Sequence, residues 1–459
     1  MNTMSKYKIT MGLEIHVQLK TNSKLFSCAS TLRTDNPNEN IQLLDLGIPG
    51  ALPLLNKKAV ELAIMVVLAL NGEVNLNSTF DRKHYKYPDL PLGFQITQFF
   101  NPIGRNCYLT INEKKYTIQQ IHMETDAGKT IHLQDISMRN ATGKSEDLLD
   151  FNRCGMPLIE IVTNPCFSDA KEVKEFLKEL ILNLKYSGAS DCNLEDGNIR
   201  FDVNISLSDN EKLGQRVEIK NLNSFEGLMS AIEYESNRQE ELLNNGKTIN
   251  QETRGWNEKI TYTLRNKEDS VDYGYIPEWD LPILHIEEFE VEELKRKLPK
   301  LPSDYRKMFN ELTFEVPKKT QEVLLSDMKL IEFCWSCNLN ITIINLLAND
   351  VLSIHNWFNY KDHLMIIFEY LNEQLISIKV AKELIDRIEE NPAIIVEKEN
   401  KKMIVDENQI NECIQLVFQS NAKEYERYLN GDEKIKMFFY GQVLKKINAS
   451  PNILNKLLG

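Results

Sequence analysis

The sequence predicts an α+β fold in which a β-rich part with a few long helices, up to about residue 290, is followed by an all-α part. Three observations lead to this prediction. Segments in which apolar and polar residues alternate, as in half-buried strands, lie mainly before residue 290. The same region contains long helical segments that end at glycine. From Glu287 onward, apolar residues follow the 3.6-residue helical period, and strand and turn signals are rare.

The elements of the first part are bounded by residues that cap helices or form turns. Turn residues such as GIPG at 47–50 separate the strand segments. Strands are predicted at 12–19, 118–123, 199–206 and 216–221. Helices are predicted at 57–71, 169–186 and 225–245, with Gly72, Gly188 and Gly246 as their C-terminal caps.

The second part reads as short helices separated by caps. The segment LPSD at 301–304 is typical of a helix start, and Asn391 with Pro392 should break a long helix. We therefore predict three domains, 1–290, 291–400 and a small helical tail at 401–459.

Composition indicates a globular protein without a membrane segment. The chain has 459 residues, 42% of them hydrophobic and 26% charged. Its longest apolar stretch, AIMVVLAL at 63–70, is far short of the roughly 20 residues that a membrane helix needs. The first eleven residues contain no apolar export segment. We therefore expect a cytoplasmic protein with no membrane partner.

The charge argues against a general DNA-binding protein, because the net charge is −13. Residues 401–459 differ, with nine Lys or Arg against seven Asp or Glu. The slight positive excess permits a local nucleic-acid contact at this end. The eight cysteines are scattered, which fits reduced thiols. Cys334 and Cys337 have metal-ligand spacing, but no second pair follows them, which favours a structural helix over a zinc or redox site.

One predicted strand carries polar residues with the chemistry of a metal site. In GLEIHVQL at 12–19, Glu14, His16 and Gln18 share one face, with neighbours ~7 Å apart. A carboxylate and an imidazole at this spacing can approach one metal ion. The alternative is an ordinary solvent-facing strand surface.

Further carboxylates lie on other predicted strands. Glu160 interrupts the apolar run PLIEIV at 157–162, so it needs a cation, a metal or hydrogen-bond donors, and a structural salt bridge is the alternative. Asp202 shares a face with Arg200 and Asn204. A third alternating set consists of His122, Glu124 and Asp126. Carboxylates and a histidine together suggest a site for a hard cation such as Mg²⁺.

Cations that could contact phosphate are also present, but nucleotide motifs are not. Arg82, Lys83 and Lys129 are candidate phosphate partners. The chain has no GxxxxGK[ST] or kinase glycine loop, so any ATP site must be unconventional. It also lacks a GxSxG nucleophile elbow, which argues against covalent acyl chemistry on this chain.

The motifs, taken in order, resemble those of the B subunits of the aspartyl/glutamyl-tRNA(Asn/Gln) amidotransferases, the GatB/GatE family. The resemblance covers nearly all of residues 8–285 and is looser in the C-terminal part. It rests on GLEIHVQL at 12–19, FDRK at 80–83, YPD at 87–89, DAGK at 126–129, PLIEIV at 157–162, EIKNLNSF at 218–225, QETR at 251–254, DYGYIPE at 272–278 and DLP at 280–282, with GQV at 441–443 and PNIL at 451–454.

The resemblance implies a fold, partners and a reaction. The fold is an α+β cradle followed by a helical domain and a tail that contacts tRNA. The subunit works in a heterotrimer with a glutaminase (A) subunit, which releases ammonia into an internal channel, and a small (C) subunit. ATP phosphorylates the side-chain carboxylate of Glu-tRNA(Gln) or Asp-tRNA(Asn), and ammonia then displaces phosphate. The chain would thus be part of a carbon–nitrogen ligase that uses ATP and Mg²⁺.

The resemblance also implies roles for individual residues. Lys83, Arg82 and Glu124 are the candidate catalytic residues, and Tyr85 lines the same region. Lys129 and Arg200 are assigned to cofactor binding. The candidate metal ligands are Glu14, His16, Glu124, Glu160 and Asp202.

This sequence departs from the family at two places. Where the family commonly has a second glutamate and a lysine, this chain has Thr125 and Leu92. If those two residues form an ion pair at the ammonia gate, both partners are missing here, and the channel is gated differently or is leakier. Some members carry a zinc site of cysteine pairs soon after the first motif. Only Cys28 remains in that region, so no zinc is expected.

Two other functions stay open on the sequence alone. One is a non-catalytic tRNA-binding scaffold of the same complex, although such a scaffold has no need of a buried carboxylate cluster. The other is a stand-alone Mg²⁺-dependent phosphotransferase acting on a small molecule, against which the full motif series argues. A bacterial-type cytoplasmic location is expected, with an organellar matrix as the alternative for a mature chain.

Overall fold

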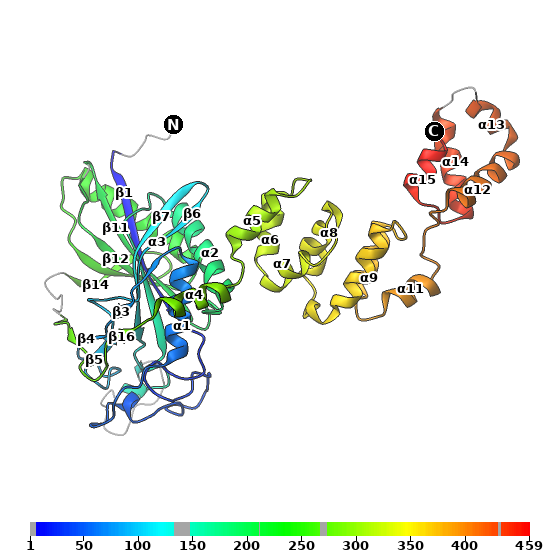
Figure 1. Cartoon of the computed structure of the whole chain (residues 1–459). Helices are drawn as coiled ribbons and strands as arrows, with labels where there is room; N and C mark the ends of the chain where they lie inside the picture. Colours follow the sequence, from blue (N-terminus) through cyan, green and yellow to red (C-terminus); the bar gives the residue numbers. More distant parts are fainter. Residues whose placement is uncertain (1–5, 133–146, 211, 267–272, 430–432) are drawn as a thin grey trace, which may run out of the picture. The chain divides into compact units, whose positions relative to one another are not determined.

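The computed structural model describes residues 6–132, 147–210, 212–266, 273–429 and 433–459. The chain divides into two compact units, Met1–Pro302 and Ser303–Gly459 (Figure 1). The first unit is a mixed α/β structure around a large sheet, and the second is built of helices. At this level the predicted fold class is confirmed. The predicted boundaries at residues 290 and 400 stay predictions.

A nine-stranded sheet forms the centre of the first unit, in the order β14-β13-β12-β11-β1-β10-β7-β6-β2. Neighbouring strands are antiparallel except for the parallel pair β12 and β13. Its strands are β1 (Lys8–Gln18), β2 (Glu73–Val74), β6 (Gly104–Ile111), β7 (Lys114–Thr125), β10 (Pro157–Thr163), β11 (Ile199–Ser208), β12 (Val217–Leu222), β13 (Glu252–Trp256) and β14 (Thr261–Asn266). Each of the four strands predicted from alternation overlaps one of these.

One face of this sheet is apolar and packs against helices. Leu13, Ile15 and Val17 of β1 are buried in one core with residues of all three long helices. These helices are α1 (Lys57–Ala69), α2 (Ala170–Tyr186) and α3 (Phe225–Asn244) (Figure 1). Because successive strand residues point to opposite sides, the polar residues between the apolar ones project from the other face.

The glycines past the helices differ in their roles. Gly188 and Gly246 take the predicted left-handed conformation, with φ of 71° and 66°. After α1, however, Asn71 is the left-handed residue, with φ of 54°, and the prediction that Gly72 is the cap is wrong. Gly72 instead allows close packing on β6, since a Cβ there would lie 2.1 Å from Cys107 Sγ.

Three small sheets complete the first unit. The sheet β15-β4-β5 adjoins β7, where Gln95 Nε2 donates a hydrogen bond of 2.7 Å to the carbonyl oxygen of Thr125. Asp272, the first residue of the DYGYIPE motif, lies outside the described residues. The remaining elements are β3 (Asn77–Ser78), β4 (Asp81–His84), β5 (Phe94–Thr97), β8 (Lys129–His132), β9 (Asp147–Asp150), β15 (Ile276–Pro277), β16 (Leu284–His285), the 3₁₀ helix η1 (Leu44–Leu46) and α4 (Glu288–Lys297).

The second unit consists of short helices. The first of them begins at Pro302, the last residue of the first unit, close to the predicted helix start. The sequence predicted that Asn391 and Pro392 break a long helix, whereas in the structure they begin one. Pro392 stands in the first turn of α11, where its missing N–H costs nothing, and Asn391 caps that helix. The helices are α5 (Pro302–Asn310), α6 (Lys318–Leu325), α7 (Met328–Cys334), α8 (Ile341–Leu346), the π-helix η3 (Leu347–Val351), the 3₁₀ helix η4 (Trp357–Tyr360), α9 (Lys361–Asn372), α10 (Ile378–Asp386), α11 (Pro392–Lys398), α12 (Glu407–Ser420), α13 (Ala422–Leu429), α14 (Glu433–Lys446) and α15 (Pro451–Leu457). Within the described part of the chain, no helix has the length and apolar character to cross a membrane.

Candidate functional site

The register of four neighbouring strands builds the polar face of the large sheet. His16 of β1 lies opposite Glu160 of β10, and Glu160 lies opposite His122 of β7. On the other side of β1, Glu14 lies opposite Asp202 of β11. Directly opposed residues of antiparallel strands point to the same face. Side chains from segments far apart in the sequence therefore meet on one surface.

A first group, the histidine cluster, consists of His16, His122, Glu124 and Glu160. His16 Nε2 lies 3.5 Å from Glu124 Oε1 and 3.6 Å from Glu160 Oε2. His122 Nε2 lies 2.9 Å from Glu160 Oε2 and 3.6 Å from Glu124 Oε2. One ligand atom from each of His16, Glu124 and Glu160 lies within 4.8 Å of the other two. These three residues are close enough to hold one metal ion.

Within the histidine cluster, the neighbouring charges outweigh the effect of burial on His122 and Glu160. Burial lowers the pKa of His122, but the carboxylates of Glu160 and Glu124 outweigh it and raise that pKa to about 10. Burial raises the pKa of Glu160, but His122, His16 and Lys83 outweigh it and hold that pKa well below its usual range. The raised pKa favours the protonated form of the His122 imidazole, whose Nδ1 is buried without a hydrogen-bond partner.

A second group, the acidic cluster, consists of Glu14, Asp202 and Glu218, from β1, β11 and β12. One carboxylate oxygen of each lies within 4.8 Å of the other two. The ammonium of Lys220 lies among them, with Nζ 2.6 Å from Asp202 Oδ2 and 2.8 Å from Glu218 Oε1. Glu14 Oε1 accepts a hydrogen bond of 2.9 Å from Asn204 Nδ2. Burial and the neighbouring carboxylates nevertheless raise the pKa of Glu14.

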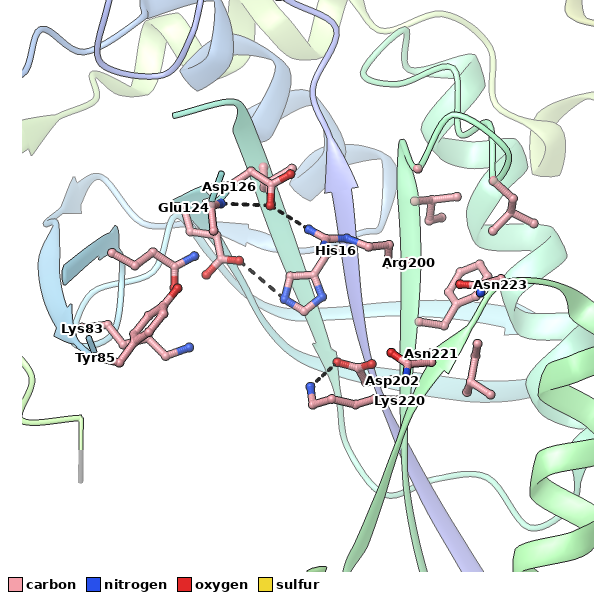
Figure 2. Close-up of a pocket in the computed structure, with 18 residues that line it drawn as sticks. His16, Lys83, Tyr85, Glu124, Asp126, Arg200, Asp202, Lys220, Asn221 and Asn223 are labelled. Atoms are coloured by element: carbon pink, nitrogen blue, oxygen red, sulfur yellow. Dashed lines mark hydrogen bonds and ion pairs between the residues drawn. The ribbon is translucent and has the colours of Figure 1, made fainter. Parts of the chain in front are cut away.

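A cavity of about 420 Å³ is lined by members of both clusters (Figure 2). Lys83 and Tyr85, from the segment around β4, line it as well. Lys83 Nζ lies 5.0 Å from the ring centroid of Tyr273 and 6.0 Å from that of Tyr85, within cation–π range. Burial lowers the pKa of Lys83, but the carboxylates of Glu124 and Glu160 outweigh it, so the pKa is raised and the cation is favoured.

Asp126 and Arg200 form another part of the cavity wall, and Arg153 pairs with Asp126 from outside it. Asp126 Oδ1 accepts a hydrogen bond of 3.0 Å from Arg200 Nη2 (Figure 2). Asp126 Oδ2 accepts one of 2.7 Å from Arg153 Nη2. Burial raises the pKa of Asp126, but the two guanidinium groups outweigh it and lower the pKa. The side chain of Arg200 is 49% exposed, so its guanidinium can reach a ligand in the cavity.

The structure brings most of the predicted site residues to this cavity, but not Arg82 or Lys129. Arg82 precedes Lys83 on β4, so the two side chains point to opposite faces of the strand. Arg82 donates hydrogen bonds to the carboxylate of Glu278, from Nε at 2.9 Å and from Nη2 at 2.6 Å. Lys129 is exposed on β8 and does not line the cavity. The roles predicted for these two residues gain no support from the geometry. The residues brought together are Glu14, His16, Lys83, Glu124, Glu160, Arg200 and Asp202.

The sequence reasoning missed three residues of the clusters. His122 alternates with Glu124 and Asp126, so its place on the polar face was visible, but its pairing with Glu160 depends on strand register. Glu218 and Lys220 alternate on β12 within the EIKNLNSF motif. That alternation is the signal that would have placed both of them on the face of Asp202.

The two departures from the family lie at one small apolar pocket. Leu92 and Thr125 both line a pocket of about 30 Å³, together with Phe94 and Ile96 of β5. Asp126 borders both this pocket and the larger cavity. Leu92 and Thr125, which are separated in the sequence, therefore line the same pocket.

The cysteines show the character of thiols rather than of thiolate ligands. Cys334 is fully buried at the end of α7, and burial raises its pKa to about 12 and that of Cys337 to about 11. Cys28 is exposed. Neither metal-capable group found among the described residues contains a cysteine. The expected absence of zinc stays a prediction.

Comparisons with known proteins agree with the motif series. Residues 9–292 match the family described as the GatB/GatE catalytic domain, and residues 339–459 match the one described as the GatB domain. The chain is 37% identical over 479 residues to a protein of Thermotoga sp. (strain RQ2) that is named as the B subunit of an aspartyl/glutamyl-tRNA(Asn/Gln) amidotransferase. Proteins with the same name from Caldicellulosiruptor saccharolyticus and Carboxydothermus hydrogenoformans are 36% identical over 481 and 480 residues. Each match covers 99% of this chain and 98% of the relative.

Proposed function

The chain belongs to the GatB/GatE family and is the B-type subunit of a tRNA-dependent amidotransferase, and on this premise we propose that it carries out the ATP-dependent step of the reaction. In that step the γ-phosphoryl group of ATP is transferred to the side-chain carboxylate of Glu-tRNA(Gln) or Asp-tRNA(Asn). Ammonia then attacks the activated carbonyl carbon, the C–O bond to phosphate breaks, and the amide forms.

The observation that carries this proposal is the pair of clusters beside one cavity. The cavity, about 420 Å³, has the size of a site for a small molecule or for the end of a larger one. The carboxylates and the imidazole that could bind a cation lie on the nine-stranded sheet beside the cavity. The ammonium of Lys83 and the guanidinium of Arg200 lie on the cavity wall. Phosphoryl transfer needs such positioning and charge compensation rather than a nucleophile on the protein.

The donor sets fit a hard divalent cation such as Mg²⁺. The acidic cluster offers three carboxylates, and the histidine cluster offers two carboxylates and an imidazole. Glu14, Asp202 and Glu218 would hold one ion, and His16, Glu124 and Glu160 another. A bound cation would draw phosphate oxygens to the cavity and offset negative charge during transfer.

Lys83 is the residue best placed to act on the transferred group. Its ammonium is favoured by Glu124 and Glu160, and the rings of Tyr273 and Tyr85 confine it. A confined cation beside the acceptor carboxylate stabilises the charge that develops on phosphoryl oxygens without reorganising during the reaction. Arg200, anchored on Asp126, can orient the substrate carboxylate or a phosphate in the same way.

Ammonia has to reach this cavity from a partner subunit. The name of the relatives implies a multi-subunit complex, and we propose a glutaminase subunit and a small subunit as its other members. Leu92 and Thr125 place uncharged side chains at the positions of the proposed ion pair, in a small pocket that Asp45 and Asp126 also line. We infer that ammonia entry in this chain is not controlled by a salt bridge between these two positions. A cytoplasmic location is proposed on the same basis, since the relatives are bacterial.

Product formation by the purified complex tests the proposal. With glutamine, ATP and Mg²⁺, the complex should convert Glu-tRNA(Gln) to Gln-tRNA(Gln) or Asp-tRNA(Asn) to Asn-tRNA(Asn). Glu160→Gln should lower this rate about 100-fold or more, because it removes the charge that His16 and His122 face.

The matched control is Glu61→Gln on α1, a residue that pairs with Lys58 and lies outside both clusters. It should leave the rate unchanged. Normal binding of the misacylated tRNA and glutamine hydrolysis by Glu160→Gln would show that the variant is folded. If the wild-type complex bound both tRNAs and hydrolysed glutamine but formed neither product, the chain would be a scaffold rather than an enzyme.

A further inference from the structure

Lys220 lies in the acidic cluster in the place that a bound cation would take. Its Nζ is 2.6 Å from Asp202 Oδ2 and 2.8 Å from Glu218 Oε1, and both residues belong to the metal-capable group with Glu14. The ammonium therefore shares two carboxylates with the cation expected there. Two cations that compete for the same carboxylates at this distance repel each other, so both cannot keep these contacts.

Lys220 has room to leave the acidic cluster. The side chain of Lys220 is 34% exposed and borders the cavity beside Asn221 and Asn223 (Figure 2). Lysine carries its charge on a flexible four-carbon stem. Its ammonium can therefore leave the carboxylates by rotating about side-chain bonds, without movement of β12.

The charges favour such an exchange. Glu14, Asp202 and Glu218 bring three carboxylates together, and one ammonium offsets part of their repulsion. A divalent cation offsets more of it and accepts several oxygen ligands at once. Once displaced, the ammonium has the cavity of about 420 Å³ beside it. In the proposed function this cavity receives the phosphates of ATP, which are good partners for lysine.

We propose that Lys220 is an exchangeable counter-ion: it holds the acidic cluster together without metal, leaves it when a divalent cation binds, and then positions a nucleotide phosphate in the cavity. The last part rests on the proposed function, whereas the exchange itself does not. Lys220 is thus a positioning residue that couples arrival of the metal to the release of a phosphate-binding cation.

The first test is Mn²⁺ binding to the full chain in its complex, measured by electron paramagnetic resonance. Lys220→Met removes the competing ammonium and keeps a side chain of similar length. It should bind one Mn²⁺ per chain about tenfold or more tightly than the wild type does. Lys114→Met is the matched control, because Lys114 pairs with Glu172 at 2.5 Å outside both metal-capable groups, and it should leave Mn²⁺ affinity unchanged. Equal or weaker binding by folded Lys220→Met would overturn the exchange.

A second test uses the unaltered protein and decides the matter if Lys220→Met does not fold. Lysine acetylation followed by mass spectrometry reports how accessible each ammonium is. Saturating Mg²⁺ alone should raise the reactivity of Lys220 several-fold relative to Lys114, and a non-hydrolysable ATP analogue should lower it again. Unchanged reactivity of Lys220 at saturating Mg²⁺ would reject the exchange.

The outcomes separate this inference from the proposed function. Tighter Mn²⁺ binding by Lys220→Met in a complex whose wild type forms no amidated tRNA would keep the exchange and reject the function. Product formation by the wild type, with Mn²⁺ affinity unchanged in Lys220→Met, would support the proposed function and reject the exchange.

Discussion

Lys24 is a lysine buried inside the first unit, and it does not line the cavity. Its side chain is fully enclosed, and its Nζ lies 3.4 Å from Asp45 Oδ2 and 3.2 Å from the carbonyl oxygen of Phe151. Asp45 accepts further hydrogen bonds from Ser27 and from the backbone of Gln42. Burial lowers the pKa of Lys24 despite the nearby carboxylate. The pair joins the irregular segment before α1 to the chain just after β9.

Replacing Lys24 by Met should lower the free energy of unfolding by about 3–5 kcal/mol, because Asp45 is left buried and unpaired. The double variant Lys24→Met/Asp45→Asn should be more stable than Lys24→Met alone, since no uncompensated charge remains. Urea denaturation of the purified chain, followed by circular dichroism, measures both. Destabilisations that simply add would contradict the pairing.

Single residues of the site could be predicted where a local pattern carries the information. Alternation placed Glu14 and His16 on one face, and an acidic residue in an apolar run singled out Glu160. Alternation does not tell which strand lies alongside. The pairing of Glu160 with His122 and the insertion of Lys220 between two carboxylates follow from register, which the sequence did not provide.

At the scale of elements, Glu172 joins helix α2 to the sheet. Its carboxylate accepts hydrogen bonds from the backbone N–H and the hydroxyl of Ser168, and Lys114 of β7 pairs with it at 2.5 Å. Asp169 caps the same helix by accepting a hydrogen bond from the N–H of Glu172. Burial raises the pKa of Glu172, but Lys114 and Ser168 outweigh it, so the folded protein lowers this pKa.

This pair should make part of the stability depend on pH. A carboxylate with a lowered pKa in the folded state stabilises the protein above its ordinary pKa of 4.5, and the contribution is lost as the pH falls through the lower, folded-state value. Glu172→Gln should therefore lower the unfolding free energy by about 1 kcal/mol at pH 7, and by progressively less as the pH falls below 4.5 toward the folded-state pKa. Urea denaturation at several pH values measures the difference.

Glu175→Gln on the same helix is the control for that series. Glu175 contacts Lys171 at 3.9 Å near the surface, and its loss should change the unfolding free energy by about 0.5 kcal/mol or less. A difference between wild type and Glu172→Gln that does not shrink as the pH falls below 4.5 would speak against the assignment to ionised Glu172.

Elements could be predicted to the extent that they are long enough to show a period. The long helices and the strands β1, β7, β11 and β12 follow clear periodic patterns. Strands of two residues, such as β2 and β15, are too short for any pattern, although β15 helps to form the small sheet that carries Lys83. The role of Gly72 was also hidden, because the contact with Cys107 belongs to packing between α1 and β6.

At the scale of the whole molecule, chemistry and charge are distributed unevenly. Both clusters lie in the unit Met1–Pro302, which contains the whole match to the GatB/GatE catalytic domain, at 9–292. The chain has a net charge of −13, yet residues 401–459 carry a small positive excess. An acidic protein that acts on tRNA has to confine its phosphate contacts to local cationic regions. The denser motifs end near residue 285, in agreement with the location of both clusters, and a tRNA contact by residues 401–459 stays a prediction.

The fate of one oxygen atom tests the central claim most directly. The complex is given Glu-tRNA(Gln), or Asp-tRNA(Asn) if that is the substrate it amidates, labelled with ¹⁸O in the side-chain carboxylate, together with glutamine, ATP and Mg²⁺. If the carboxylate is phosphorylated before ammonia displaces phosphate, ¹⁸O must appear in inorganic phosphate, one labelled atom for each amide formed. Amidated tRNA formed together with unlabelled phosphate would contradict the account, because ATP would then be hydrolysed without activating the carboxylate.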